Sequence, residues 1–156
     1  SLPPFDIETL DFEALDATLD GMSKSWKMYF WTLGWLYLIP HLKRPSELQV
    51  QWLGAAIDYT AVWCHDRKAG PAFFWEDHAT ANRLATLLDL TNQLHSTDAV
   101  RDRQPELQLI VHTHVAELKH YMATGWENSN HGAFHAIGVI NAGLHSGHKD
   151  RRGPNS

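Results

Sequence analysis

The chain has 156 residues, of which 44% are hydrophobic, and a formal net charge of −5, which suits one domain with its own core. Lys and Arg do not cluster except in the short run 149–152, so the charge pattern does not favour nucleic acid as a partner. The apolar run 28–39 is shorter than the roughly 20 residues that cross a bilayer, so we expect a buried helix there and no membrane span. Cys64 is the single cysteine, so no intramolecular disulfide can form.

The first half of the chain is predicted to form helices separated by proline and glycine. Residues 1–22 are expected to be an N-terminal extension with only a weak helical stripe. The next helix is predicted over residues 23–39, apolar on nearly all sides and ended by Pro40, which cannot continue a helix. Ser46 opens a capping-box pattern, which predicts the start of another helix. That helix is expected to run up to a loop at 66–75, which contains a Gly-Pro pair.

The second half of the chain predicts three further helices with polar connections. Asp77 is a good N-cap residue, and Pro105 stands where prolines are favoured in a first turn. The predicted helices cover residues 78–94, 105–122 and 130–144, with a loop at 96–104, a turn at 124–129 and a polar tail at 145–156. No segment alternates apolar and polar residues as a strand does. Residues 23–144 are therefore predicted to be all-α, built from antiparallel helical hairpins in a bundle or in part of an α/α barrel.

The first candidate for chemistry is the turn 128–132, with the sequence Asn-Ser-Asn-His-Gly, at the start of the last helix. Asn130 lies at the cap, where free backbone N–H groups and the helix dipole favour an anion. At about 100° per residue, His131, His135 and Gly138 share one face of that helix, and Gly138 leaves room for a close approach. The other face carries the expected core stripe of Ala133, Ile137, Ile140 and Leu144. The pattern predicts a carboxylate-binding corner, and the alternative is a plain cap with a surface histidine.

A second candidate lies around Trp75 and His78, with Arg83 farther along the same predicted helix. Indole rings either fill cores or serve as flat platforms for sugars, so Trp75 fits both uses. His78 and Arg83 are five residues apart and point in different directions on a helix, so they are not expected to face one small pocket squarely. The alternative for Arg83 is an ion pair with an acidic neighbour.

Histidine spacing offers a metal site as a third possibility. The two histidines of the last helix are four residues apart, and Glu117-x-x-His120 has the spacing found in di-iron bundles. Such bundles need two copies of that motif and two more glutamates, and only one copy is present. Cys64 has only one adjacent histidine, so a cysteine nucleophile is not expected. No glycine-rich phosphate loop occurs, and we expect no cofactor.

Four stretches, taken together and in order, resemble the heparinase II/III-like polysaccharide lyases. The resemblance covers roughly residues 5–144, and the Asn-His-Gly element is its most recognisable part. The stretches are Ser25-Trp26-Lys27 through Trp35-Leu36, Phe74 through Arg83, His112 to Tyr121, and the turn 128–132 with the following Gly138-Val139-Ile140.

The resemblance implies an N-terminal α/α toroid that is joined, in the family, to a β-sandwich. It also implies β-elimination at uronic acid residues of an anionic polysaccharide. The proton to be removed lies beside a carboxylate, and hydrogen bonds that neutralise this carboxylate stabilise the enolate-like intermediate. By resemblance, Asn130 and His131 are the catalytic pair with this role. Substrate-binding roles are implied for Trp75, His78, Arg83, Asn128 and His135.

The chain also departs from the family. It ends soon after the Asn-His helix, and Tyr121 does not match the position of the family's catalytic tyrosine. We therefore expect an incomplete toroid, a fragment with low or no activity that can self-associate through uncovered helix faces. The family further implies a periplasmic or secreted bacterial location, with a signal peptide that is not part of this chain. Two alternatives stay open, namely a non-catalytic carbohydrate-binding or assembly module and a small metal-binding helical bundle.

Overall fold

The computed structural model describes residues 21–41, 45–66 and 70–126, together with Leu19, Ala136, residues 138–140 and Gly143. All regular structure in these residues is helical and none of them forms a strand, which confirms the predicted all-α class. The elements are α2 (Lys24–Trp31), the 3₁₀ helix η2 (Gly34–His41), α3 (Pro45–His65), α4 (Asp77–Gln93), α5 (Asp98–Arg101), α6 (Gln104–Tyr121) and the π-helical segment η3 (Met122–Trp126).

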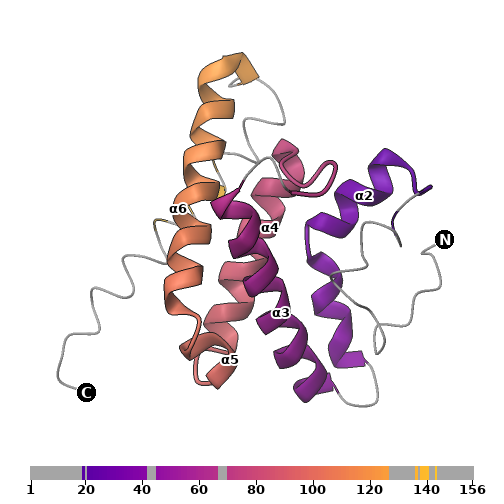
Figure 1. Ribbon diagram of the computed structural model, residues 1–156, viewed down its shortest axis with the longest axis vertical. Coiled ribbons are helices and arrows are strands. Elements are labelled where there is room, and N and C mark those ends of the chain that lie inside the picture. The colour runs from indigo at the N-terminus through magenta and orange to yellow at the C-terminus, as the bar shows by residue number, and fades with distance from the viewer. Residues whose placement is uncertain are drawn as a thin grey trace.

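The three long helices α3, α4 and α6 run alternately up and down (Figure 1). α6 packs against both α3 and α4, while η2 packs against α3 and α2 against α4. The short α5 lies between α4 and α6 at the bottom of the view. The antiparallel hairpins predicted from the sequence are therefore present, and their continuation into a toroid stays a prediction.

The core between these helices is rich in aromatic rings. Trp31 is 1% exposed and meets Trp63 and Phe74 edge-on, with ring centroids 5.2 and 5.5 Å away. Trp52 is also buried and meets Trp35 edge-on. Edge-to-face contacts of this kind add to the large apolar area that each ring removes from water. These tryptophans therefore serve packing.

The structure divides the helix that was predicted over 23–39. α2 ends at Trp31, and Leu33 takes a left-handed φ of 59° while its side chain stays buried. Thr32 supports the break, because its hydroxyl bonds to the backbone on both sides of it. η2 then continues beyond Pro40. The prediction of one continuous helix that ends at Pro40 was wrong.

Other helix boundaries differ by smaller amounts. α3 begins one residue before Ser46, so Ser46 is not its N-cap, and α4 begins at Asp77 rather than after it. The loop expected at 96–104 contains α5, and the first part of the turn expected at 124–129 belongs to η3. Pro105 lies in the first turn of α6 as predicted. Shifts of one or two residues are typical of helix ends.

The last predicted helix, 130–144, is described at five residues, all of them helical. Gly138 is buried, and a Cβ added there would lie 2.7 Å from the Leu118 side chain and 3.7 Å from the Cα of Ala81. Ile140, by contrast, is 59% exposed. Gly138 was predicted on the open face of this helix and Ile140 in its core stripe, and both predictions are therefore wrong. The close approach that Gly138 permits is made by α4 and α6.

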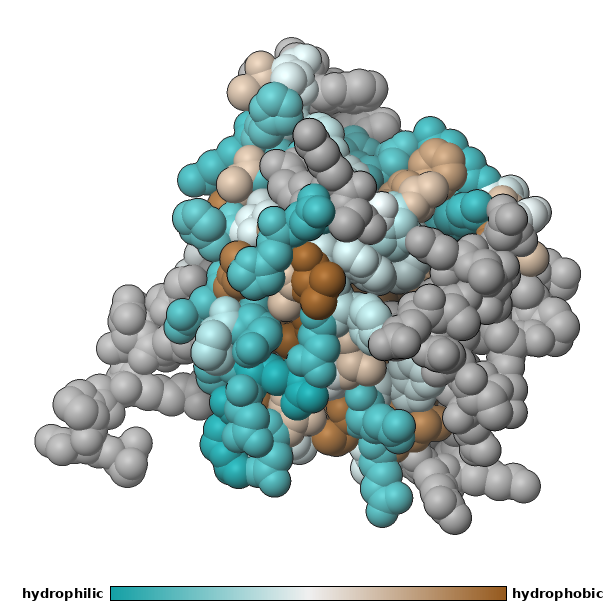
Figure 2. Space-filling model, in the orientation of Figure 1, coloured by the Kyte–Doolittle hydropathy of each residue, from teal (hydrophilic) through white to brown (hydrophobic). Residues whose placement is uncertain are grey.

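The face shown in Figure 2 is mainly hydrophilic where α5 and the lower part of α6 lie, with hydrophobic residues in small separate patches. None of the described helices has the length and apolar character that a bilayer span requires.

Candidate functional site

A pocket of about 680 Å³ opens at the N-terminal end of α4. Three parts of the chain form it, namely the start of α2, the segment that leads into α4 and the end of α6. Its volume lies within the range of roughly 300–1,000 Å³ found for small-molecule sites. The lining residues are Lys24, Pro71, Phe73, Trp75, Glu76, Asp77 and Tyr121.

Three aromatic rings give the pocket its apolar walls. The backbone carbonyl of Trp75 accepts a hydrogen bond from the Tyr121 hydroxyl, which ties the end of α6 to the segment before α4. Phe73 has a φ of 65°, a left-handed conformation that is costly for a bulky residue. Backbone strain of this kind persists only where the surrounding structure imposes it. The Phe73 ring is thus held in the wall at an energetic cost.

Each described charged residue of the pocket already has a partner. The Lys24 ammonium lies 2.9 Å from a carboxylate oxygen of Glu76 and 5.4 Å from the centre of the Phe73 ring. Asp77 is buried, and its Oδ1 accepts a hydrogen bond of 2.7 Å from the backbone N–H of His78. This N–H lies in the first turn of α4, where the helix dipole favours a negative charge. Among the described lining residues, Lys24, Glu76 and Asp77 together carry one excess negative charge.

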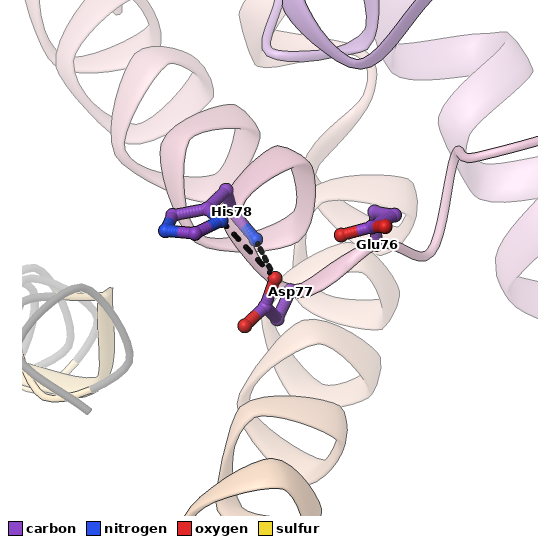
Figure 3. Close-up of side chains that lie close together, drawn as sticks. All are labelled: Glu76, Asp77 and His78. Atoms are coloured by element: carbon purple, nitrogen blue, oxygen red, sulfur yellow. Dashed lines mark hydrogen bonds and ion pairs between the residues drawn. The ribbon is translucent and has the colours of Figure 1, made fainter. Parts of the chain in front are cut away.

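Glu76, Asp77 and His78 are also the one group of described residues whose ligand atoms could meet a metal ion, since these atoms lie within 4.8 Å of one another. Figure 3 shows the Asp77 carboxylate turned toward His78, with Glu76 on the other side of Asp77. The Nδ1 of His78 lies 3.3 Å from the same Oδ1 that accepts the backbone bond. Glu76 is held by Lys24. These internal contacts account for the cluster, and we assign no metal to it.

The metal hypothesis drawn from histidine spacing gains no support from the described residues. Glu117 is buried in α6 and His120 is exposed. No further described side chain places a ligand atom with them.

Arg83 lies in the interior behind Trp75 and has no exposed surface. Its Nη1 donates to the backbone carbonyl of Trp31 at 2.9 Å, and its guanidinium carbon lies 3.5 Å above the centre of the Phe74 ring. Burial lowers the pKa of Arg83 to about 9, so the guanidinium stays charged at neutral pH. The alternative of an ion pair with an acidic residue is not seen in the described part of the chain.

His114 from α6 completes the surroundings of Arg83. Its Nε2 accepts a hydrogen bond of 3.0 Å from the Nε–H of Arg83, so this nitrogen carries no proton. The proton of the neutral ring therefore lies on Nδ1, which is 2.9 Å from the carbonyl of Ile110 and 3.9 Å from the Sγ of Cys64. Arg83 thus fixes both the charge and the tautomer of His114.

The predicted site residues separate into those that line the pocket, those that lie beside or behind it, and those outside the described part of the chain. Trp75 lines the pocket. His78 stands on the first turn of α4 beside the pocket but does not line it, and Arg83 is enclosed by the core. The structure therefore does not bring these three residues into one pocket. The helical spacing had predicted that His78 and Arg83 would not face the same small pocket, and they do not. The remaining predicted residues, Asn128, Asn130, His131 and His135, lie outside the described residues.

Sequence reasoning missed four of the described residues that line the pocket, namely Lys24, Pro71, Phe73 and Tyr121. Lys24 and Phe73 carry no local motif that separates them from ordinary surface and loop residues. Tyr121 fell within the helix predicted over 105–122 and was considered a residue that does not match the family's catalytic tyrosine. Its position as the last residue of α6, next to a turn with candidate chemistry, was the available signal.

The chain is anchored near this pocket on both sides of the turn 128–132. Before the turn, Tyr121 forms part of the pocket wall. After it, Gly138 packs against Leu118, one turn before Tyr121, and against Ala81, one turn after the start of α4. Described residues on each side of residues 128–132 therefore pack at the end of α6 and the first turns of α4.

Neither a family model, nor a curated protein, nor a solved structure matches this chain.

Proposed function

We propose that this chain contributes the helical portion of a polysaccharide lyase, which cleaves an anionic polysaccharide by β-elimination at uronic acid residues. The observation that carries the proposal is the aromatic pocket at the start of α4, which the end of α6 also lines. The ordered resemblance of the sequence to heparinase II/III-like lyases supports it independently.

The pocket has the character of a sugar site. Its volume suits one or two pyranose rings, and its walls include an indole, a phenyl and a phenol ring. The C–H faces of sugars pack on such rings while polar groups at the rim receive the hydroxyls. Glu76 and the Tyr121 hydroxyl are the kind of groups that serve this purpose.

The residues proposed for the reaction are Asn130 and His131. A base removes the proton from C5 of the uronate, the bond from C4 to the glycosidic oxygen breaks, and a double bond forms between C4 and C5. The leaving oxygen takes up a proton. The Asn130 amide and the His131 ring would donate hydrogen bonds to the uronate carboxylate, which stabilises the negative charge that builds up on it. A tyrosine or histidine is suited to moving the proton.

The test is a panel of uronate-containing polysaccharides with the chain at high concentration. The conjugated double bond of the unsaturated product absorbs in the ultraviolet, so turnover appears as a rise in absorbance. We expect a slow rise with at least one polymer and none with a neutral glucan. Polymers that neither react nor bind, as measured by calorimetry, would contradict the proposal.

A second candidate function is a non-catalytic carbohydrate-binding module, and the same pocket favours it because its described lining includes three aromatic rings. Binding of a polymer without any rise in absorbance, unchanged by Asn130→Ala and His131→Ala, would select this second function. Loss of binding in those variants would instead place both residues in contact with the sugar.

A further inference from the structure

His114 of α6 lies in the interior of the bundle and has no exposed surface. Its Nε2 accepts the hydrogen bond of 3.0 Å from the Nε–H of Arg83, and its Nδ1 lies 2.9 Å from the carbonyl oxygen of Ile110. Both ring nitrogens are therefore engaged while the ring is neutral. Because Nδ1 already carries a proton, a second proton can bind only at Nε2.

A proton on Nε2 is incompatible with this arrangement. The Nε–H of Arg83 and the Nε2–H of His114 would be two donors directed at each other across 3.0 Å. The ring would also carry a positive charge beside a guanidinium that is itself fully buried, and like charges out of water repel strongly. Proton uptake by His114 and the hydrogen bond from Arg83 therefore exclude each other.

The other titratable groups around the pair come from α3 and from α6 itself, whereas the adjoining η3 contains none. Cys64 of α3 has its Sγ 3.9 Å from the Nδ1 of His114, and both Cys64 and Tyr121 interact electrostatically with Arg83. A thiol and a phenol are uncharged at acid pH. Glu117, one turn along α6, is buried and favours a charged His114 while it is ionised. Arg83 opposes that charge through a direct hydrogen bond to the nitrogen that would take the proton, so we expect its effect to dominate.

The pair of Arg83 and His114 lies directly behind the pocket wall. The Trp75 ring is tilted against the His114 ring with centroids 5.1 Å apart, and the guanidinium carbon of Arg83 lies 3.5 Å above the Phe74 ring. Trp75 lines the pocket, and its backbone carbonyl accepts the hydrogen bond from Tyr121. A movement of either member of the pair therefore reaches the wall through direct contacts.

We propose that the hydrogen bond from Arg83 to His114 is an acid-sensitive connection, which breaks when His114 takes up a proton and thereby loosens the pocket wall at Trp75. Above about pH 6.5, where an ordinary histidine is mostly neutral, the connection is intact. As the pH falls below this value, the unfolded chain binds a proton at His114 that the folded chain excludes, so the folded state loses stability. The connection does not depend on what the pocket binds, so its tests succeed or fail separately from the proposed lyase.

Histidine NMR of the whole chain tests the connection directly. Long-range ¹H–¹⁵N spectra distinguish the two neutral tautomers from the charged ring, and nuclear Overhauser contacts to the Trp75 ring assign the signals of His114. We expect the Nδ1–H tautomer at pH 7 and a neutral ring at pH 5.5, where exposed histidines are mostly charged. At lower pH the indole signal of Trp75, assigned through Trp75→Phe, should shift in step with the His114 ring. An Nε2–H tautomer, or a ring that becomes charged together with exposed histidines, would overturn the inference.

The pH dependence of stability tests it from a second side. His114→Gln keeps an acceptor near the position of Nε2, but its amide does not titrate. One proton excluded from the folded state raises the unfolding constant by up to tenfold per pH unit. In urea titrations we therefore expect the ratio of the unfolding constants, parent over variant, to rise at least about fivefold between pH 6.5 and pH 5.

Glu117→Gln is the matched control for this measurement, because it removes the other buried titratable group on the same helix. Its unfolding constant should still rise with acid as that of the parent does. Parallel pH profiles for the parent and His114→Gln would overturn the inference. A rise that disappears in Glu117→Gln but persists in His114→Gln would place the acid response at Glu117 and overturn it as well.

Discussion

Arg83 of α4 donates a hydrogen bond of 2.9 Å to the backbone carbonyl of Trp31, the last residue of α2. The carbonyls at a helix C-terminus have no partner within the helix and carry the negative end of its dipole. The buried guanidinium therefore supplies the hydrogen-bond donor that the last carbonyl of α2 lacks, at the point where the chain turns through Leu33 into η2. The same side chain bonds to His114 of α6, so Arg83 joins three helices behind the pocket.

Replacing Arg83 by Met should lower the free energy of unfolding by about 2–4 kcal/mol, because the Trp31 carbonyl and the Nε2 of His114 would be left buried without a donor. Arg101→Met is the control, since Arg101 pairs with Asp98 on the exposed surface and should cost less than about 1 kcal/mol. Urea denaturation measures both. An Arg83→Met chain as stable as the parent would contradict the role of Arg83 in holding the three helices together.

The two non-glycine residues with left-handed φ in the described part of the chain, Leu33 and Phe73, should differ in how much stability they lose on replacement by glycine. Phe73→Gly relieves backbone strain and removes a ring that is only partly buried, so the free energy of unfolding should change by less than about 1 kcal/mol. Leu33→Gly relieves similar strain but removes a side chain that is 1% exposed, and should cost about 2–4 kcal/mol. Thermal unfolding of the two variants measures both changes in stability. Equal losses of stability in Phe73→Gly and Leu33→Gly would show that Phe73 is a core residue and not a pocket wall.

Gly138 and Gly143 form a matched pair in the last helix. An added Cβ at Gly138 would lie 2.7 Å from the Leu118 side chain, whereas at Gly143 it would meet nothing within 4 Å. Gly143→Ala should raise the free energy of unfolding by up to about 1 kcal/mol through helix propensity. Gly138→Ala should lower it by about 1–2 kcal/mol, because the overpacking exceeds that gain. Chemical denaturation of both variants checks this, and equal effects would mean that Gly138 is not packed against α6.

Tyr37 should make stability depend on pH in the alkaline range. Burial, followed by the hydrogen bond to Asp89 and its negative charge, raises the pKa of Tyr37 well above its usual value. The unfolded chain releases this proton near pH 10 while the folded chain retains it, so the contribution is complete below about pH 10 and is lost as the pH rises further. The stability difference between the parent and Tyr37→Phe should therefore shrink above pH 10 in urea titrations. Tyr29→Phe, at a 79% exposed position, is the control variant for the loss of a tyrosine hydroxyl.

The long helices could be predicted because their signals are local. α3, α4 and α6 follow from apolar residues at helical spacing, and Asp77 and Pro105 mark where α4 and α6 begin to within a residue. The break after Trp31 could not be predicted, because the residue that satisfies the end of α2 lies in another helix. Apolar pattern alone favoured a continuous helix there.

The pocket could be predicted only in part, for a related reason. Trp75 stood out as an aromatic residue beside charged ones, but Lys24 and Tyr121 reach the pocket from α2 and α6. Only the packing of three segments shows that they meet. Arg83 was expected to bind substrate, but it has no exposed surface and instead supports the neighbouring residues. A charged side chain in a sequence gives no sign of whether it faces a ligand or a helix end.

The most direct test of the account is ultraviolet absorbance with the panel of uronate-containing polysaccharides, recorded for the parent chain and for Asn130→Ala combined with His131→Ala. The account predicts a rise for the parent with at least one polymer and none for the double variant. Turnover that persists in the double variant would contradict the central claim that this chain carries the carboxylate-neutralising part of a polysaccharide lyase.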